Sequence, residues 1–271
     1  MATIVAVEDP ADERVGDFVL LSDPDLRRLR SRSGGGDGSF FIAEGELVIR
    51  QLLRSRYQVR SLLLTPPRLA SLQAELAELD VPVFVGGQEV VNAISGFHLH
   101  RGALAAAERG EPAEAPQVAA AADLLVVAEG VNDHENLGAL FRNAAAFGAG
   151  GVLLDPTSAD PLYRRSVRVS MGQVLRVPFA RLHGWPESLA GLRRSGLEVL
   201  ALTPAADATD IAQLRRRRRQ ALVVGAEGPG LSAAALAAAD LRVRIPMAPG
   251  VDSLNVATAA AVALHHLARR G

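Results

Sequence analysis

The sequence predicts an α/β fold in two units, and two observations lead to that prediction. Short apolar runs recur along the chain, and stretches with the apolar spacing of helices separate them; this alternation is typical of α/β domains. A polar segment rich in proline and glutamate, RGEPAEAP at residues 109–116, interrupts the alternation and has the composition of a linker. We therefore expect a first unit over residues 1–114 and a second over residues 115–271.

The first unit is expected to be a small α/β domain. Its glycine-rich segment SRSGGGDG at residues 31–38 is typical of a flexible loop. Its apolar runs and amphipathic stretches predict strands over residues 40–43, 59–64, 81–85 and 103–107 and helices over residues 44–56, 69–79 and 88–94.

The second unit is expected to contain a parallel sheet, because its apolar runs do not alternate with polar residues, as in strands that helices cover on both faces. The predicted strands span residues 124–128, 151–154, 197–202, 221–225 and 241–245, and the predicted helices span residues 136–147, 162–169, 186–195 and 255–270.

The composition excludes several kinds of chemistry. The chain of 271 residues has no cysteine and no lysine, so all 29 basic residues are arginine. This excludes thiolate catalysis, disulfides, a Walker A lysine and a Schiff-base lysine. No apolar run approaches the ~20 residues of a membrane span, and the N-terminus lacks the pattern of a secretory signal. We therefore expect a cytoplasmic protein without a membrane partner.

Two loops rich in glycine and proline lie near the C-terminus. The strand at 221–225 opens into AEGPGLS at 226–232, and the strand at 241–245 opens into PMAPGVDSLN at 246–255. Glycine lets a backbone approach a ligand closely, and proline fixes its path. The pair predicts a concave site built from main-chain groups; glycines that only turn strands into helices are the alternative. The glycine spacing differs from the GxGxxG of dinucleotide sites.

Three segments resemble, in this order, the three motifs of the SpoU/TrmH family of RNA 2′-O-ribose methyltransferases in the SPOUT superfamily. They are NDHENLGALFRNA at 132–144, LVVGAEGPGLS at 222–232 and IPMAPGVDSLNVAT at 245–258. The resemblance covers roughly residues 120–271. Residues 37–110 look like the small ribosomal-protein-like RNA-binding domain of many members. Asn143 departs from the pattern, since threonine is common at that position.

The resemblance implies a fold that the pattern of elements alone does not predict. Members of the family have a parallel sheet with a deep trefoil knot near the C-terminus, and they form homodimers in which both subunits build each active site. It also implies S-adenosyl-L-methionine as the cofactor, held largely by the backbone of the knot loops. The residues implied for this role are Leu202, Thr203, Gly225, Glu227, Gly228, Ile245, Met247, Ser253, Leu254 and Asn255.

Arg142 is the first implied catalytic residue. From the sequence alone it could be an ordinary solvent-exposed helical arginine. Gly138, one turn before it, instead favours a functional interpretation, because the bare helix face beside the guanidinium leaves room for a ligand. The family assigns the matching arginine to activation of the ribose 2′-hydroxyl. Arginine keeps its proton under almost all conditions and is therefore a poor base. We expect Arg142 instead to orient the hydroxyl and to stabilise the alkoxide that develops there.

Four further residues are implied at the catalytic site. Asn136 either caps its helix or structures the site around Arg142, and Glu227 either lies in a solvated turn or fixes the knot loop or Asn136. Ser253 and Asn255 either cap the last helix or contact ribose and cofactor. Methyl transfer from a sulfonium needs an in-line approach and no metal, so the catalytic gain is expected mainly from positioning.

Other basic features have less specific interpretations. With a formal net charge of −1, any surface for nucleic acid must be local. The run Arg215–Arg219 is expected to be a solvated connector, with phosphate contact as the alternative. Arg164, Arg165 and Arg168 form a basic helix face that is a candidate for RNA contact. His98 and His100, with Arg101, lie near the domain junction; we expect core or surface histidines there, with RNA contact as the alternative. Adjacent His265 and His266 have the wrong spacing for a helical metal pair.

The predicted function is therefore S-adenosylmethionine-dependent methylation of a ribose 2′-hydroxyl in RNA. The extra N-terminal domain favours rRNA over tRNA as substrate. A catalytically inactive RNA-binding or ribosome-assembly factor of the same fold is the alternative, and calorimetry with the cofactor would separate the two. A nucleotide-dependent oxidoreductase is the third hypothesis, and it lacks the GxGxxG fingerprint.

Overall fold

A computed structural model describes residues 2–19, 21, 40–214 and 219–268. The chain packs into two compact units: residues 1–111 together with 162–175, and residues 112–161 together with 176–271. The chain therefore passes between the units three times, and the segment Leu162–Leu175 of the expected second unit packs within the first. The glycine-rich loop predicted at residues 31–38 lies outside the described residues.

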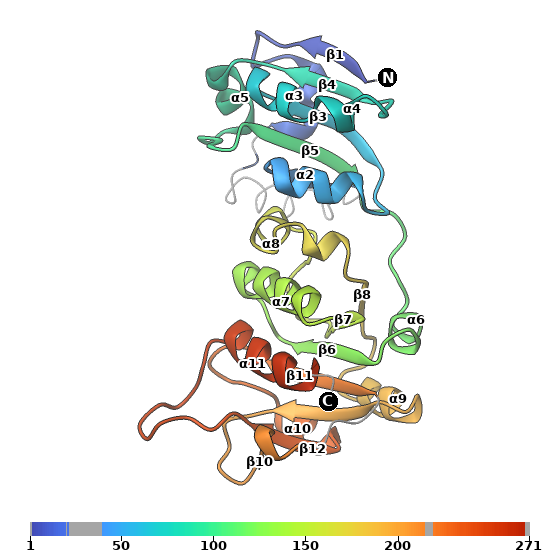
Figure 1. Cartoon of the computed structure of the whole chain (residues 1–271), viewed down its shortest axis with the longest axis vertical. Coiled ribbons are helices and arrows are strands. Elements are labelled where there is room, and N and C mark those ends of the chain that lie inside the picture. Colours follow the sequence, from blue (N-terminus) through green and yellow to red (C-terminus); the bar gives the residue numbers. More distant parts are fainter. Residues whose placement is uncertain (1, 20, 22–39, 215–218, 269–271) are drawn as a thin grey trace. The chain divides into compact units, whose positions relative to one another are not determined.

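The first unit is built on a five-stranded sheet in the order β1-β4-β3-β5-β2 (Figure 1). Strands β1, β4 and β3 are mutually parallel, whereas β5 runs antiparallel to both β3 and β2. The elements are β1 (Thr3–Ala6), η1 (Glu13–Phe18), β2 (Phe40–Glu44), α2 (Glu46–Leu53), β3 (Val59–Leu64), α3 (Pro66–Ser71), α4 (Gln73–Leu76), β4 (Pro82–Val85), α5 (Gln88–Ser95), β5 (Ala103–Glu108), α8 (Arg164–Val169) and η2 (Gln173–Leu175).

A buried ion pair holds the late segment in the first unit. Arg164 on α8 donates from Nη1 to Oε2 of Glu44 at 2.7 Å, and both side chains are more than nine-tenths buried. The Arg164 guanidinium also stacks on the ring of Phe97 at 4.5 Å. The interpretation of Arg164 as part of an RNA-facing helix surface is therefore wrong, because its guanidinium is buried and forms an ion pair with Glu44 inside the unit.

The second unit is built on a seven-stranded sheet in the order β10-β12-β9-β11-β6-β7-β8, in which every neighbouring pair is parallel. The prediction of a parallel sheet is confirmed. The elements are α6 (Ala115–Ala120), β6 (Leu124–Glu129), α7 (His134–Ala146), β7 (Gly151–Leu154), β8 (Phe179–Arg181), α9 (Ser188–Arg194), β9 (Glu198–Leu202), β10 (Thr209–Asp210), η3 (Ile211–Gln213), β11 (Gln220–Gly225), α10 (Ala233–Ala238), β12 (Leu241–Arg244) and α11 (Val256–Ala268).

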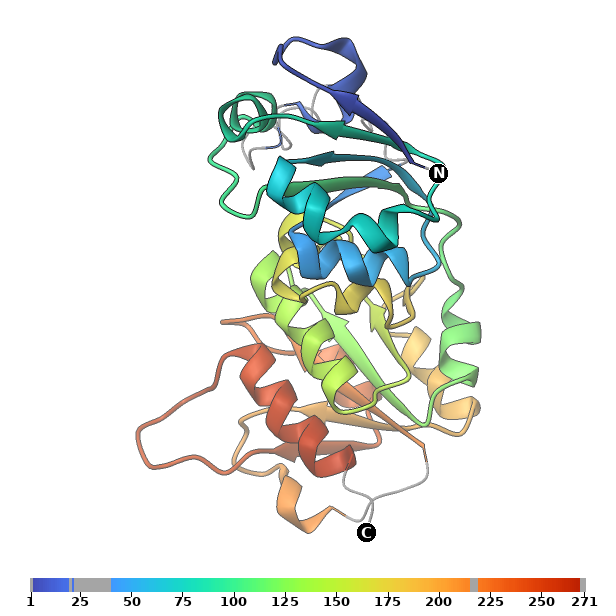
Figure 2. The same cartoon turned by 45° about the horizontal axis from the view of Figure 1, so that its top comes forward.

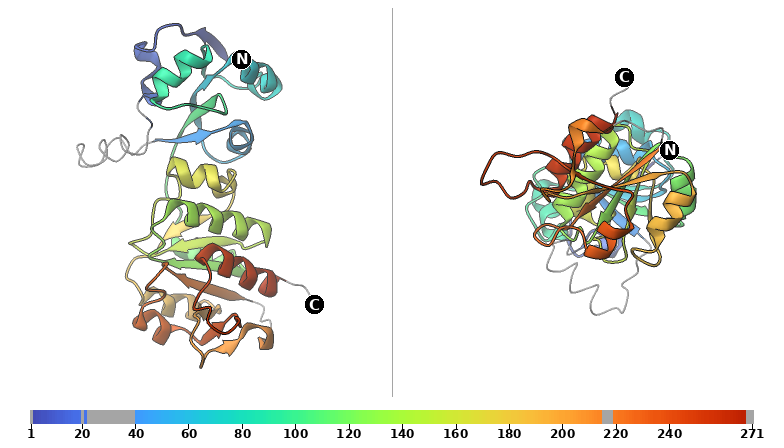
Figure 3. Two further views of the ribbon diagram at one scale, coloured as in Figure 1. Left: turned by 90° about the vertical axis from the view of Figure 1, so that its left-hand side faces the viewer. Right: turned by 90° about the horizontal axis from the view of Figure 1, so that it is seen from below.

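Helices cover both faces of this sheet (Figure 3). On one face, side chains of α6, α9 and α10 join alternate strand residues in a core that includes Leu125, Val127 and Val223. On the other face, α7 and α11 lie side by side (Figure 2). The loop between β12 and α11 extends away from the sheet (Figures 1 and 2, and the right panel of Figure 3). Because all strands are parallel, their connecting loops meet at one edge of the sheet.

Several predicted boundaries are wrong, for identifiable reasons. Glu44 ends β2 rather than beginning a helix, because Gly45 with a φ of +96° breaks the chain direction between β2 and α2. The helix predicted at 69–79 begins earlier, at Pro66, and is divided at Leu72 into α3 and α4. The linker predicted at 109–116 already contains the start of α6, because proline fits the first turn of a helix.

Candidate active site

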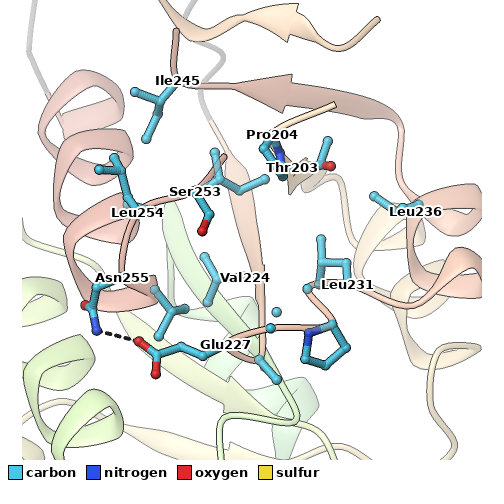
Figure 4. Close-up of a pocket in the computed structure, with 18 of the residues that line it drawn as sticks. Thr203, Pro204, Val224, Glu227, Leu231, Leu236, Ile245, Ser253, Leu254 and Asn255 are labelled. Carbon is cyan, nitrogen blue, oxygen red and sulfur yellow. Dashed lines mark hydrogen bonds between the residues drawn. The ribbon is translucent and has the colours of Figure 1, made fainter. Parts of the chain in front are cut away.

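A cavity of about 560 Å³ opens at the carboxyl ends of β9, β11 and β12 (Figure 4). Its walls come from the segments that follow these strands and from the start of α11. All ten residues expected to bind the cofactor line this cavity: Leu202, Thr203, Gly225, Glu227, Gly228, Ile245, Met247, Ser253, Leu254 and Asn255. The two glycine-rich and proline-rich loops therefore meet, as their spacing predicts.

The loop after β11 is closed on itself by its own backbone. The N–H of Gly230 donates to the carbonyl of Ala226 at 3.0 Å, and Gly228 and Gly230 have positive φ values of +87° and +69°. A Cβ at Gly225 would lie 2.3 Å from the carbonyl carbon of Gly230, so only glycine lets the strand end pass this turn. In contrast, nothing lies within 4 Å of a Cβ placed at Gly228 or Gly230, so the space beside these two residues is open.

Asn255 connects three segments of the site with one amide group. Its Nδ2 donates to Oδ1 of Asn136 at 2.7 Å and to Oε1 of Glu227 at 2.6 Å. Its Oδ1 accepts from the backbone N–H groups of Ala257 and Thr258 at 3.0 and 3.1 Å, so Asn255 also caps α11. The capping alternative for Asn255 is therefore confirmed for its oxygen, while its nitrogen joins the two other motif segments; contact with ribose or cofactor stays a prediction.

Asn136 does not cap its own helix. Helix α7 begins at His134, and Asp133 is the cap, since its Oδ1 accepts from the N–H groups of Glu135 and Asn136 at 2.8 Å each. The prediction that the helix begins at Asn136 is wrong, because the chain offers a capping residue three positions earlier. As a result the Asn136 side chain is available to Asn255.

The cavity is lined mainly by apolar side chains and by backbone. Val224, Leu231, Leu236, Ile245 and Leu254 contribute apolar surface. Hydroxyl groups come from Thr203 and Ser253, and Glu227 is the one charged side chain among the lining residues in the described part of the chain. Leu236 comes from α10, a helix missed in the sequence although Ser232 caps an alanine-rich run there.

Arg142 lies outside this cavity. It is exposed on α7, and within the described residues its side chain forms no hydrogen bond or ion pair. The next residue, Asn143, donates from Nδ2 to the carbonyl of Ala257 at 2.8 Å and so links α7 to the first turn of α11. Of the five implied catalytic residues, Glu227, Ser253 and Asn255 line the cavity and Asn136 is joined to them through Asn255, while Arg142 lies outside the cavity.

A buried carboxylate behind the site was missed in the sequence. Glu129, at the end of β6, accepts a hydrogen bond from Nε1 of Trp185 at 2.5 Å and another from the backbone N–H of Ser232 at 2.9 Å. Ser232 ends the cavity loop and caps α10 through its hydroxyl. An acidic residue at the end of an apolar strand is the only sequence signal for this anchor; nothing in the sequence points to Trp185.

Asp155, which follows β7, holds the turn after β6 through hydrogen bonds. It is 2% exposed and accepts hydrogen bonds from the hydroxyls of Ser158 and Thr157 and from the N–H groups of Gly130 and Ser158. Burial raises the pKa of Asp155, but these hydrogen bonds outweigh burial and hold the pKa below its ordinary value. The charged carboxylate thereby fixes the turn that follows β6.

Arg219 is a structural residue. Its guanidinium donates to the carbonyls of Ala119 and Ala122 at the end of α6 and to the carbonyl of Ser195 at the end of α9. Carbonyls in the last turn of a helix lack the full set of intrahelical partners, and cations are favoured at helix C-termini. The interpretation of Arg219 as part of a solvated connector is therefore wrong, while phosphate contact stays an untested alternative. Residues 215–218 lie outside the described residues.

The described residues contain neither a membrane-spanning helix nor a cluster of metal ligands. None of the helices there is both long and apolar enough to cross a membrane. No group of three or more His, Asp or Glu side chains in the same residues is arranged to hold a metal ion.

Comparison with known proteins identifies relatives over the whole chain. The sequence model of the SpoU rRNA Methylase family matches residues 123–265. A tRNA/rRNA methyltransferase of Mycobacterium tuberculosis, itself uncharacterized, is 48% identical over 266 residues, which cover 97% of this chain and 91% of the relative.

Solved structures resemble both units of the chain. The AdoMet-bound rRNA methyltransferase from Sinorhizobium meliloti is similar with a TM-score of 0.76 and 25% identity, covering 97% of each chain. An RNA 2′-O ribose methyltransferase is similar with a TM-score of 0.72 and 27% identity, covering 98% of each chain.

Proposed function

Because the chain belongs to the SpoU rRNA Methylase family, we propose that it transfers a methyl group from S-adenosylmethionine to a ribose 2′-hydroxyl of RNA. One observation carries the proposal: Asn255 ties the three motif segments together at a single cavity through Asn136 and Glu227. Residues that only capped helices or turned strands would not need to converge on one amide. The 2′-hydroxyl as acceptor is also supported by the similarity to an RNA 2′-O ribose methyltransferase.

The cavity fits the proposed cofactor. Its volume of about 560 Å³ lies in the usual range for small-molecule sites. Apolar walls at Ile245 and Leu254 suit an adenine ring, and open space beside Gly228 and Gly230 lets a ligand approach the turn closely. When bound, S-adenosylmethionine supplies an electrophilic methyl group on a sulfonium. The similar structure with AdoMet bound supports this assignment.

The side chains of the chain have distinct proposed roles. Asn136, Glu227 and Asn255 hold the two cavity loops and α7 in register, and the Ser253 hydroxyl contacts the cofactor or the target ribose. Arg142 orients the 2′-hydroxyl and stabilises the alkoxide that develops there, since a guanidinium retains its proton near neutral pH. Positioning of the reacting groups then supplies most of the catalytic gain.

We propose a homodimer in which Arg142 serves the cavity of the partner subunit. Arg142 is exposed and outside the cavity of its own chain. Apolar surface is also exposed nearby in the same unit: Val251 and Leu254 in the extended loop are 48% and 38% exposed, and Val262 on α11 is 41% exposed. A second copy covering α11 and this loop would bury that surface and bring an arginine to the site.

The proposed knot concerns the path of the chain between β12 and α11. Strand β12 pairs with β9, whereas α11 packs against α7 and β11. The segment at 245–255 must therefore return past the ends of β9 and β11, where the start of the connection between these strands, at 203–214, also lies. We propose that it threads this connection as a trefoil knot. An experimental map in which residues 245–255 pass outside the connection would overturn it.

We further propose that the first unit binds the RNA and that the substrate is rRNA, with the enzyme in the cytoplasm. The first unit has exposed basic side chains at His98, His100 and Arg101. The similar rRNA methyltransferase from Sinorhizobium meliloti matches the chain over both units, which supports rRNA over tRNA. The division into an RNA-binding domain over 1–114 and a methyltransferase domain over 115–271, with α8 packed in the first, is part of this proposal.

The experiment that tests the function is a map of ribose methylation in rRNA and tRNA from cells with and without the gene. Loss of a 2′-O-methyl group at one position, restored by the wild-type chain and not by Asn255→Ala, is the expected result. Unchanged methylation of both RNA classes, together with no methyl transfer by the purified protein to RNA from the deleted strain, would refute the proposal.

A further inference from the structure

We propose that Glu227 makes the cavity selective for the charged methyl donor over the uncharged product of the same reaction. The inference rests on the proposed function, because it concerns the same cavity. Among the lining residues in the described part of the chain, Glu227 is the one with a charged side chain. The cavity thus combines one negative charge with walls that are mostly apolar or backbone.

The two ligands differ in charge by one unit. S-adenosylmethionine has a sulfonium, an ammonium and a carboxylate, so its net charge is +1 at neutral pH. S-adenosylhomocysteine has a thioether in place of the sulfonium and is neutral overall. A carboxylate in the cavity therefore attracts the donor more than the product, whatever the detailed pose, and the difference grows when apolar walls exclude water.

The structure holds the charge of Glu227 in place. The turn Ala226–Gly230 is closed by its backbone hydrogen bond, and Asn255 donates to Oε1 of Glu227 at 2.6 Å. This neutral donor orients the carboxylate without cancelling its charge. In the described residues Oε2 has no hydrogen-bond partner and Glu227 forms no ion pair, so one oxygen remains available to a ligand.

Selectivity of this kind has a consequence for turnover. Once the methyl group has left, the sulfonium becomes a neutral thioether and the attraction to Glu227 falls. The product then leaves more readily, and the donor displaces it at lower concentration. Glu227 is in this view a specificity-determining residue, in addition to its contact with Asn255.

The test is calorimetric binding of three probes to the full-length wild type, Glu227→Gln and Glu227→Asp. The probes are S-adenosylmethionine, S-adenosylhomocysteine and sinefungin. In sinefungin a carbon with an amino group replaces the methylated sulfur, and the protonated amine carries the positive charge. Glutamine keeps an acceptor for Asn255 and removes only the charge, while aspartate keeps the charge. Thermal unfolding of each variant checks that the loop still folds.

We expect Glu227→Gln to weaken both cationic ligands by roughly tenfold, an estimate that allows for partial exposure of the carboxylate, while the affinity for the neutral product changes less than about threefold. Glu227→Asp should keep the preference. An equal loss of affinity for all three ligands would mean that Glu227 only holds the loop in place. That result would overturn this inference and leave the proposed function standing. If the wild type bound none of the three, the proposed function would fall, and this inference with it.

Discussion

The side-chain nitrogen of Asn255 lies 2.7 Å from Oδ1 of Asn136, and this hydrogen bond joins the start of α11 to the first turn of α7. The same nitrogen contacts Glu227, and the oxygen of the same amide caps α11. Rotating the amide by half a turn would place an oxygen against the Glu227 carboxylate and leave two helix N–H groups facing a nitrogen. The hydrogen bonds thus specify a single orientation.

The two functions of Asn255 can be separated by substitution. Serine is a good helix cap but is too short to reach Asn136 and Glu227, whereas alanine loses the cap as well. We expect both variants to lose most affinity for S-adenosylmethionine in calorimetry. Asn255→Ala should in addition lose about 1 kcal/mol of unfolding free energy relative to Asn255→Ser. Equal stability of the two variants would contradict the capping role.

Residue patterns predicted the strands of the site better than its helix ends. The apolar runs at β11 and β12, and the loops that follow them, lie where the sequence places them, because buried parallel strands need continuous apolar residues. The start of α7 was misplaced because both Asp133 and Asn136 are good caps, and only the three-dimensional contact with Asn255 selects between them.

Features that depend on distant pairing could not be predicted. The burial of Arg164 requires Glu44, which is 120 residues earlier in the chain, and the packing of α8 in the first unit follows from it. Likewise, Arg219 looked like one member of a charged run, but its hydrogen bonds go to the ends of two helices. Residue type and local spacing contain no information about such partners.

The position of Arg142 predicts complementation between two inactive variants. If Arg142 serves the partner's cavity, then mixing Arg142→Ala with Glu227→Ala gives mixed dimers with one intact site. After subunit exchange we expect roughly a quarter of wild-type methyl transfer, since about half the dimers are mixed and each has one working site. If both residues act within one chain, every site in the mixture contains a defect, and no activity returns.

Gly225 is predicted to be intolerant of any side chain. Alanine there would place Cβ 2.3 Å from the backbone of Gly230, so the cavity turn must move, at a cost of about 1–3 kcal/mol. The matched control is Gly191→Ala in α9, where the nearest atom is a flexible arginine end at 3.8 Å; that helix should keep or gain stability. Calorimetry should find the cofactor affinity reduced only in Gly225→Ala.

Asp155 predicts a specific pH dependence of stability. Its pKa is lower in the folded chain than the ordinary value of 3.8, so its stabilisation is complete above that value and is lost as the pH falls through the lower folded value. We expect Asp155→Asn to destabilise the protein at pH 7 by about 1–3 kcal/mol, since hydrogen bonds to a charged group are lost. Below pH 3.8 the difference between the denaturation curves of variant and wild type should shrink. A difference independent of pH would contradict the role of the charge.

Arg219 and Arg101 should respond in opposite ways to alanine substitution. Arg219 donates to carbonyls at the ends of α6 and α9, so Arg219→Ala should lower the unfolding free energy and leave the salt dependence of RNA binding unchanged.

Arg101 is exposed in the first unit, and Arg101→Ala should keep stability within about 0.5 kcal/mol. If it contacts a phosphate, the slope of log affinity against log salt should fall by nearly one. Filter binding between 50 and 200 mM salt measures this slope, and an unchanged slope for Arg101→Ala would remove that residue from the proposed RNA surface.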